Sequence, residues 1–256
     1  MNMRAMTVAL CALMPVAGWC DDAAAPPPPQ QEWTGKGQAG YLSSQGNSEA
    51  KSANAALDAA YLDGAWKHAF HLGGLYGQSA GIVAAERWDT TWQTDYALTQ
   101  DLYTFGGLRY QHDLFNGFDY QASVAAGVGY KVFDTKTTTL DVQVGVGYKE
   151  LRPEELTKAG DGAVIGRQLE AKEGEAIGTL GVNYSQALSA TTTLTDKLLV
   201  ESGSLDTLVT NALALTVKVS AKLALSVGYA LQDNTNPPPG LQKLDRLETL
   251  NLVYSF

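Results

Sequence analysis

The feature that most constrains this chain is a period of two that runs through most of its length. In residues 118–132, FDYQASVAAGVGYKV, apolar or aromatic side chains occupy every second position, and small or polar ones lie between them. The same alternation fills residues 140–149 and 222–232. Successive side chains of an extended strand point to opposite faces, whereas a helix needs apolar residues three and four apart. The pattern therefore predicts strands.

Segmenting the chain by this alternation predicts about twelve strands and no helical domain. They span residues 33–43, 51–62, 66–77, 87–98, 102–112, 118–132, 138–150, 174–188, 192–202, 206–217, 221–232 and 243–256. Turn residues separate them, including Asp63-Gly64, Asn116-Gly117 and the proline-rich stretch 236–240. We therefore predict that residues 33–256 form one all-β domain.

The two faces of these strands distinguish a membrane barrel from a soluble sandwich. Most predicted strands are long enough to cross a bilayer at a tilt, and tyrosine or tryptophan often lies near a strand end, as membrane interfaces favour. The other face is rich in glycine and polar residues, which cannot build the packed interior of a sandwich. Lipid forces every backbone amide and carbonyl to pair within the protein. The prediction is a closed, transmembrane, antiparallel up-and-down β-barrel.

Connection lengths give this barrel an expected orientation. With both ends of the chain in the periplasm, the periplasmic turns are short and the outer loops are mostly longer, as in known barrels. The outer loops are expected at 44–50, 78–86, 113–117, 151–173, 203–205 and 233–242. The segment 151–173 is the longest and most charged of them.

The first residues carry the features of an export signal. Residues 1–20 combine Arg4 with a short apolar run, which predicts a signal peptide, and residues 21–32 form a proline-rich periplasmic spacer. A rival interpretation makes Cys20 the lipid-carrying residue of a lipoprotein. Both cysteines, Cys11 and Cys20, lie in this segment. We expect no disulfide and no cysteine-based metal site after cleavage, and a location in the bacterial outer membrane.

The segment TLNLVYSF, residues 249–256, is predicted to be the closing strand. Leu250, Leu252, Tyr254 and Phe256 fall on one face of it. The pattern resembles the C-terminal signal by which barrel-assembly machinery recognises its substrates. The alternative is an edge strand of a soluble sheet that ends on phenylalanine by chance. Expected partners are therefore the assembly machinery during biogenesis, then outer-membrane lipid and lipopolysaccharide around a monomer.

Three stretches carry a resemblance to a known family. They are AGYLSSQGNSEAKSANAAL (39–57), RYQHDLFNGFDYQASVAAGVGYKVF (109–133) and LDRLETLNLVYSF (244–256). Their most specific parts are Gly46-Asn47-Ser48 and the Asp-x-Phe-x-Gly-Phe element at 113–118. The chain resembles the salt-induced outer-membrane proteins of Gram-negative bacteria, a family of unknown function. The resemblance implies an outer-membrane location and a role under salt or pH stress, without a mechanism.

Charge and histidine placement argue against several functions. The formal net charge of −9 leaves no basic footprint for nucleic acid. His68 and His71 lie three apart on one strand, so they point to opposite faces and cannot share a metal. His112 lies near the outer rim, where an outer-membrane lipid-modifying enzyme would keep its base, but no serine motif accompanies it. We predict no enzyme activity, no cofactor and no metal.

The remaining candidates are polar residues expected to face the lumen. They are Lys36, Gln38, Asn54, Asp58, Asp89, Gln93, Asp95, Arg109, Asp119, Gln121, Lys131, Asp141, Gln143, Lys149, Asn183 and Lys197. The sequence favours a narrow channel for small solutes or ions. The alternative is a closed structural barrel in which these groups pair across the lumen. Asp196 falls on the lipid face by alternation, so we expect either a bulge that turns it inward or a mistaken strand register rather than a lipid-facing carboxylate.

Overall fold

The computed structural model describes residues 32–44, 49–160 and 162–256. The predicted signal peptide, the predicted spacer except Glu32, and Gly46-Asn47-Ser48 lie outside the described residues. The strands are β1 (Glu32–Ser44), β2 (Ala50–Asp63), β3 (Trp66–Ser79), β4 (Ile82–Ala97), β5 (Leu102–Asp113), β6 (Phe118–Asp134), β7 (Thr138–Lys158), β8 (Val164–Leu169), β9 (Glu173–Ala187), β10 (Thr192–Ser202), β11 (Thr207–Lys218), β12 (Leu223–Asn234) and β13 (Leu244–Ser255). The described residues contain no helix, and hence none able to cross a membrane.

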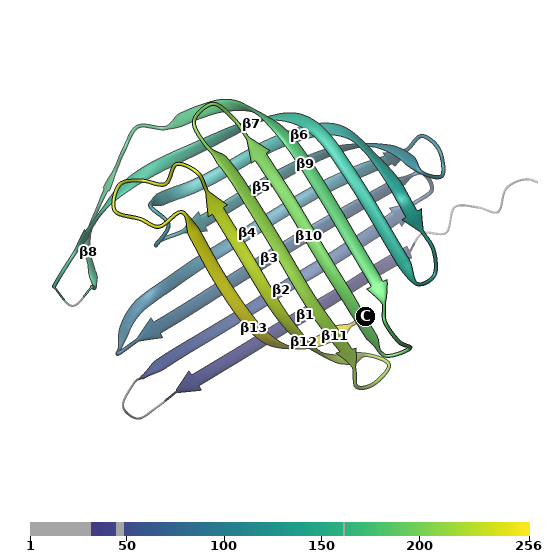
Figure 1. Cartoon of the computed structure of the whole chain (residues 1–256), viewed down its shortest axis with the longest axis horizontal. Helices are drawn as coiled ribbons and strands as arrows, with labels where there is room; N and C mark the ends of the chain where they lie inside the picture. The colour runs from purple at the N-terminus through teal and green to yellow at the C-terminus, as the bar shows by residue number, and fades with distance from the viewer. Residues whose placement is uncertain (1–31, 45–48, 161) are drawn as a thin grey trace, which may run out of the picture.

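The strands form one antiparallel sheet that closes on itself. Each strand pairs with its neighbour in sequence, except that β7 pairs with β9 as well as with β8, and β1 pairs with β13. Twelve strands thus form the ring, and β8 is attached to β7 alone. The near and far walls slant in opposite directions in Figure 1, which is the strand tilt that a barrel requires. The predicted closed, all-β barrel is confirmed.

The ring closes at a short seam between the first and last strands. Lys36, Gly37, Gln38 and Ala39 pair with Ser255, Tyr254, Val253 and Leu252. Gly35 and Phe256 then exchange two backbone hydrogen bonds of 2.9 Å each. The Phe256 ring occupies the space where a side chain on residue 35 would lie, so any larger residue there would displace this ring.

The outer face is an apolar band with aromatic residues at both ends. Val146 and Leu108 are 73% and 51% exposed there, which suits contact with lipid rather than water. At the end of the barrel with the chain termini (the terminus end), Trp33 stacks on Tyr61 with ring centroids 4.7 Å apart. At the opposite end (the loop end), Trp88 stacks on Tyr110 with centroids 5.0 Å apart. These positions match the two interfaces of a bilayer.

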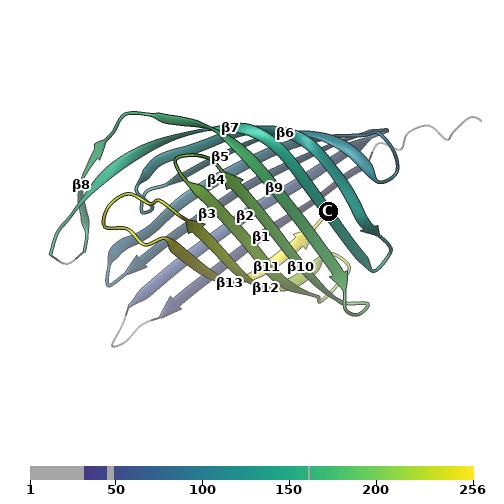
Figure 2. The ribbon, with the colours of Figure 1, turned by 45° about the horizontal axis from the view of Figure 1, so that its top comes forward.

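Two predicted outer loops are wrong. The segment 78–86 is mostly strand, because Ala80 and Gly81 adopt φ angles of 50° and 79° and reverse the chain in a tight turn. The segment 151–173 continues β7 and returns as β8, with Glu154 paired to Leu169. This hairpin projects beyond the ring in Figure 2. The alternation did not predict these strand residues because charged residues interrupt them. A hairpin outside the apolar band does not contact lipid, so it lacks the apolar stripe that identified the other strands.

Asp196 does point outward, contrary to our expectation of a bulge. Strand β10 pairs without a register shift on both sides, and Asp196 lies opposite Tyr184 and Leu213 of the outer face. The Asn211 amide donates a 2.6 Å hydrogen bond to the Asp196 carboxylate. A partner on the neighbouring strand therefore satisfies the carboxylate without any change of register.

We predict that Asn211→Leu destabilises the barrel by about 1–3 kcal/mol, because it removes the only side-chain donor to Asp196 within the described residues. If the stability of the barrel depended only on apolar outer surface, this substitution at an outer position would stabilise the barrel. The double variant Asp196→Leu/Asn211→Leu should recover the loss. Urea unfolding from lipid vesicles, followed by tryptophan fluorescence, measures this. An Asn211→Leu barrel as stable as the wild type would contradict the assignment.

Candidate functional site in the barrel lumen

The strand register places all the predicted lumen residues except Asp119 on one face of the sheet. Contacts between non-adjacent strands show that this face is the interior. Asp119 differs because β6 has a register shift between Phe118 and Tyr120. Its carboxylate instead lies 3.7 Å from the Arg152 guanidinium and 3.9 Å from the His112 ring, at the loop end. The strict alternation used for Asp119 fails at this bulge.

A layer of polar side chains spans the lumen in its loop-end half. Strands β5 and β12 are separated by five strands in either direction round the ring, yet the Gln111 amide donates a 3.3 Å hydrogen bond to Gln232. Arg109 of β5 pairs with Glu201 of β10 at 3.0 Å and donates to Gln111 at 2.7 Å. We call Arg109, Gln111, Glu201 and Gln232 the cross-lumen layer. It joins opposite walls directly.

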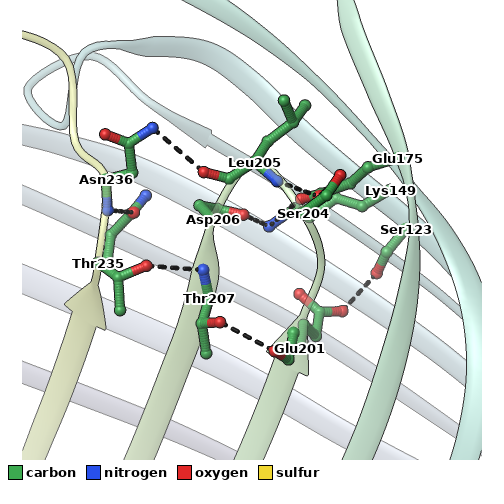
Figure 3. Close-up of polar contacts among 12 residues, drawn as sticks. Ser123, Lys149, Glu175, Glu201, Ser204, Leu205, Asp206, Thr207, Thr235 and Asn236 are labelled. Carbon is green, nitrogen blue, oxygen red and sulfur yellow. Dashed lines mark hydrogen bonds and ion pairs between the residues drawn. The ribbon is translucent and has the colours of Figure 1, made fainter.

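A second buried group fixes the turn between β10 and β11 against the wall. Lys149 is fully buried and lies 3.6 Å from Glu175, and it also contacts Asp206. Glu175 accepts a 2.6 Å hydrogen bond from the backbone of Leu205. Figure 3 shows Lys149, Glu175 and Asp206 meeting beneath this turn. Burial raises the pKa of the Asp206 carboxyl, although Lys149 opposes that effect. We call these three residues the buried triad.

Two aromatic side chains fill part of the lumen nearer the terminus end. Tyr103 and Phe105 are 6% and 9% exposed, and their rings lie over Gly129 and over Gly127 and Gly145. The Tyr103 hydroxyl donates a 2.7 Å hydrogen bond to Asp141 and accepts one of 2.8 Å from Gln143. These glycines make room for the rings. Sequence reasoning missed Tyr103 and Phe105, although their alternation with outward Thr104 and Gly106 was available.

Part of the terminus-end half stays open to solvent, although Asp95 there is buried. The Lys36 and Lys67 side chains are 47% and 54% exposed, although both face the interior. Lys197, from the opposite wall, interacts electrostatically with Asp58, Lys36 and Lys67 and forms no salt bridge within the described residues. His71 donates to Asp58 at 2.8 Å. We call Lys36, Lys67, Lys197, Asp58 and His71 the vestibule.

The histidines occupy three separate environments. His71 faces the lumen between Asp58 and Asp89, whereas His68 faces outward and contacts the Thr94 hydroxyl at 3.0 Å. His112 faces outward at the loop end, where it packs near Trp88 and contacts the Asp119 backbone carbonyl. Across the described part of the chain, no group of three or more His, Cys, Asp or Glu residues is arranged to hold a metal ion.

Together, the closed ring, the apolar outer band and the polar interior define a β-barrel of the outer-membrane type. The chain belongs to the family described as "Protein of unknown function, DUF481", which matches residues 37–256. This confirms the resemblance found in the sequence at the level of family. The Escherichia coli K12 uncharacterized protein YdiY is 24% identical over 235 residues, which cover 89% of this chain and 84% of that protein.

Three of the solved structures that resemble this chain cover most of its length. The translocator domain of autotransporter NalP from Neisseria meningitidis is 16% identical, with a TM-score of 0.49, over 88% of this chain and 86% of that one. An outer membrane channel from Pseudomonas putida F1 is 11% identical, with a TM-score of 0.46, over 92% of this chain and 98% of that one. The NanC porin is 12% identical, with a TM-score of 0.45, over 87% and 98%. These likenesses concern the fold alone.

We predict that Lys149→Met costs about 3–5 kcal/mol of stability, because it leaves two buried carboxylates side by side. The defect should shrink as the pH falls. The pKa of Asp206 is higher in the folded state than in the unfolded state, and we expect the folded-state pKa to rise further without Lys149. The contribution of protonated Asp206 to the stability of the variant is therefore lost as the pH rises through the folded-state pKa.

Unfolding of Lys149→Met and wild type in detergent between pH 4 and pH 8 tests this prediction. The triple variant Lys149→Met/Glu175→Gln/Asp206→Asn is the control, and its stability should vary less with pH than that of Lys149→Met. A defect of the same size at every pH would contradict the electrostatic explanation.

Proposed function

We propose that the protein is an outer-membrane channel for small solutes or ions and that the described conformation is its closed state. The observation that carries the proposal is the division of the lumen. A solvent-open vestibule with charged walls leads to a polar cross-lumen layer that bridges opposite strands. Such a layer acts as a gate if its contacts can be broken.

The chemistry of the layer favours a gate over a permanent plug. Its contacts are hydrogen bonds and one ion pair, which can be exchanged for bonds to water or solute at modest net cost. A scaffold needs its lumen filled throughout, as in small barrels. Here Lys36 and Lys67 keep about half of their side-chain surface open to water, which a scaffold has no reason to preserve.

The charges of the vestibule bear on what would pass. Lys36, Lys67 and Lys197 face the same space as Asp58, Asp89 and Asp95. Since neither sign dominates the wall, we propose weak ion selectivity. The proposed orientation has the terminus end in the periplasm. A role under salt stress rests on the family resemblance alone.

The closed structural barrel remains the second candidate, and one observation favours it. The 3.3 Å contact between Gln111 and Gln232 joins opposite walls, so the two side chains divide the lumen at that height. Opening must separate these two side chains. Conductance decides between the two candidates.

We predict that Arg109→Ala/Glu201→Ala raises the open fraction of single barrels in a planar bilayer at least about tenfold over the wild type. Both partners are removed together because a lone buried charge would destabilise the barrel. Lys172→Ala is the matched control, since it breaks the exposed 3.1 Å pair with Glu150 outside the lumen, and it should leave conductance unchanged. Silent bilayers for both barrels, with insertion verified, would establish the structural candidate instead.

A further inference from the structure

A separate chamber lies on the loop side of the cross-lumen layer. Its volume is about 260 Å³, and Gln121 and Gln232 contribute to its walls from β6 and β12. Asn116, Asn234, Lys243 and Asp245 also line it. With Gln242 and Lys158, the lining brings together five side-chain amides, one carboxylate and two amines. None of these groups except Gln232 belongs to the cross-lumen layer.

The chamber is covered by two loops from opposite sides of the mouth. The connection between β12 and β13 reaches the turn between β5 and β6, where a side chain on residue 117 would collide with Leu241 and Pro238. Gly117 has a φ of 79°, so both its conformation and this close approach require glycine. In Figures 1 and 2 the β12–β13 connection, in yellow, lies at the same end as the β7–β8 hairpin.

Side-chain hydrogen bonds fix the shape of both loops. The Asp113 and Asn116 side chains accept 3.0 Å bonds from the backbones of Phe115 and Phe118. Across the mouth, Asn234 accepts a 2.9 Å bond from the backbone of Asn236. The cover is therefore a built feature with defined turns.

Gln121 is the residue that points to a ligand. It is 1% exposed, and neither its amide nitrogen nor its amide oxygen has a hydrogen-bond partner within the described residues. Its neighbour in register, Gln111, is by contrast bonded to Gln232 and Arg109. A buried amide left without partners costs free energy that a bound molecule can recover.

We propose that this chamber binds a small polyhydroxylated solute of monosaccharide size. Gln121 needs both a donor and an acceptor, and hydroxyl groups supply both, whereas a simple anion supplies no donor. The other amides and Asp245 offer further partners for hydroxyls. The volume lies below the ~300–1,000 Å³ of pockets for drug-sized ligands, which limits the solute to a small one.

The position of Gln232 links this site to the gate. Gln232 lines the chamber and also accepts the hydrogen bond from Gln111 that crosses the lumen. A solute that bonds to Gln232 competes with that contact. As the recognition site of a channel, the chamber rests on the proposed function, but binding can be measured without conduction.

The test is saturation-transfer NMR on the purified full barrel, in a detergent without a sugar headgroup, with D-glucose as the probe. Sodium acetate serves as a probe without hydroxyl groups. Gln121→Leu should weaken glucose binding at least about tenfold and leave folding intact, because the amide it removes has no partner. Gln38→Leu makes the same change on the lumen face of β1, outside the chamber, and should bind as the wild type does.

A second variant, Gln232→Leu on the β12 wall, should also weaken glucose binding and covers the case in which Gln121→Leu fails to fold. Two results would overturn the inference and leave water as the occupant. One is the absence of glucose binding to the wild type, and the other is binding by both chamber variants as tight as that of the wild type. Conductance without glucose binding would support the proposed channel and contradict the binding site. Glucose binding to a barrel that never conducts would contradict the channel and support the binding site.

Discussion

The structure depends on the pairing of β1 with β13. A sheet in lipid cannot leave a row of backbone amides and carbonyls unpaired, because each such group would cost several kcal/mol without water to bond it. All other neighbouring strands of the twelve-stranded ring are joined by long ladders, but the seam has only a short ladder and the reciprocal bonds between Gly35 and Phe256. Closure is thus carried by few contacts, and both the apolar outside and the wet inside exist only once it is made.

Closure creates two environments with opposite demands. Outward residues meet lipid, so even one carboxylate there, Asp196, carries its own donor in Asn211. Inward residues contact water or one another, depending on their height along the barrel axis. Near the loop end, Lys149 and Glu201 are buried, and each forms an ion pair with a different partner. Near the terminus end, Lys36 stays half exposed. The channel proposal depends on this gradient from an open to a filled lumen.

Much of the fold could be predicted from the sequence because it depends on alternation, a local property. The strands, the ring and the inward face of residues such as Arg109 and Lys149 follow from a period of two. Asp119 could not be placed, because a bulge at the start of β6 reverses the alternation. The contacts of the candidate site could be predicted even less well. Arg109 meets Glu201, and Gln111 meets Gln232, across 92 and 121 residues of sequence, and only the closed ring brings these pairs together.

The most direct measurement of closure is a cysteine pair across the seam. Gln38 and Val253 face each other at a non-hydrogen-bonded position, where Cα atoms lie ~4.5 Å apart and a disulfide can form. Gln38→Cys/Val253→Cys should therefore cross-link within one chain under mild oxidation in membranes, giving a band of altered mobility on a denaturing gel that disappears on reduction. Single-cysteine variants should give no such band. A double variant that stays reduced, or that links only separate chains, would contradict a closed barrel.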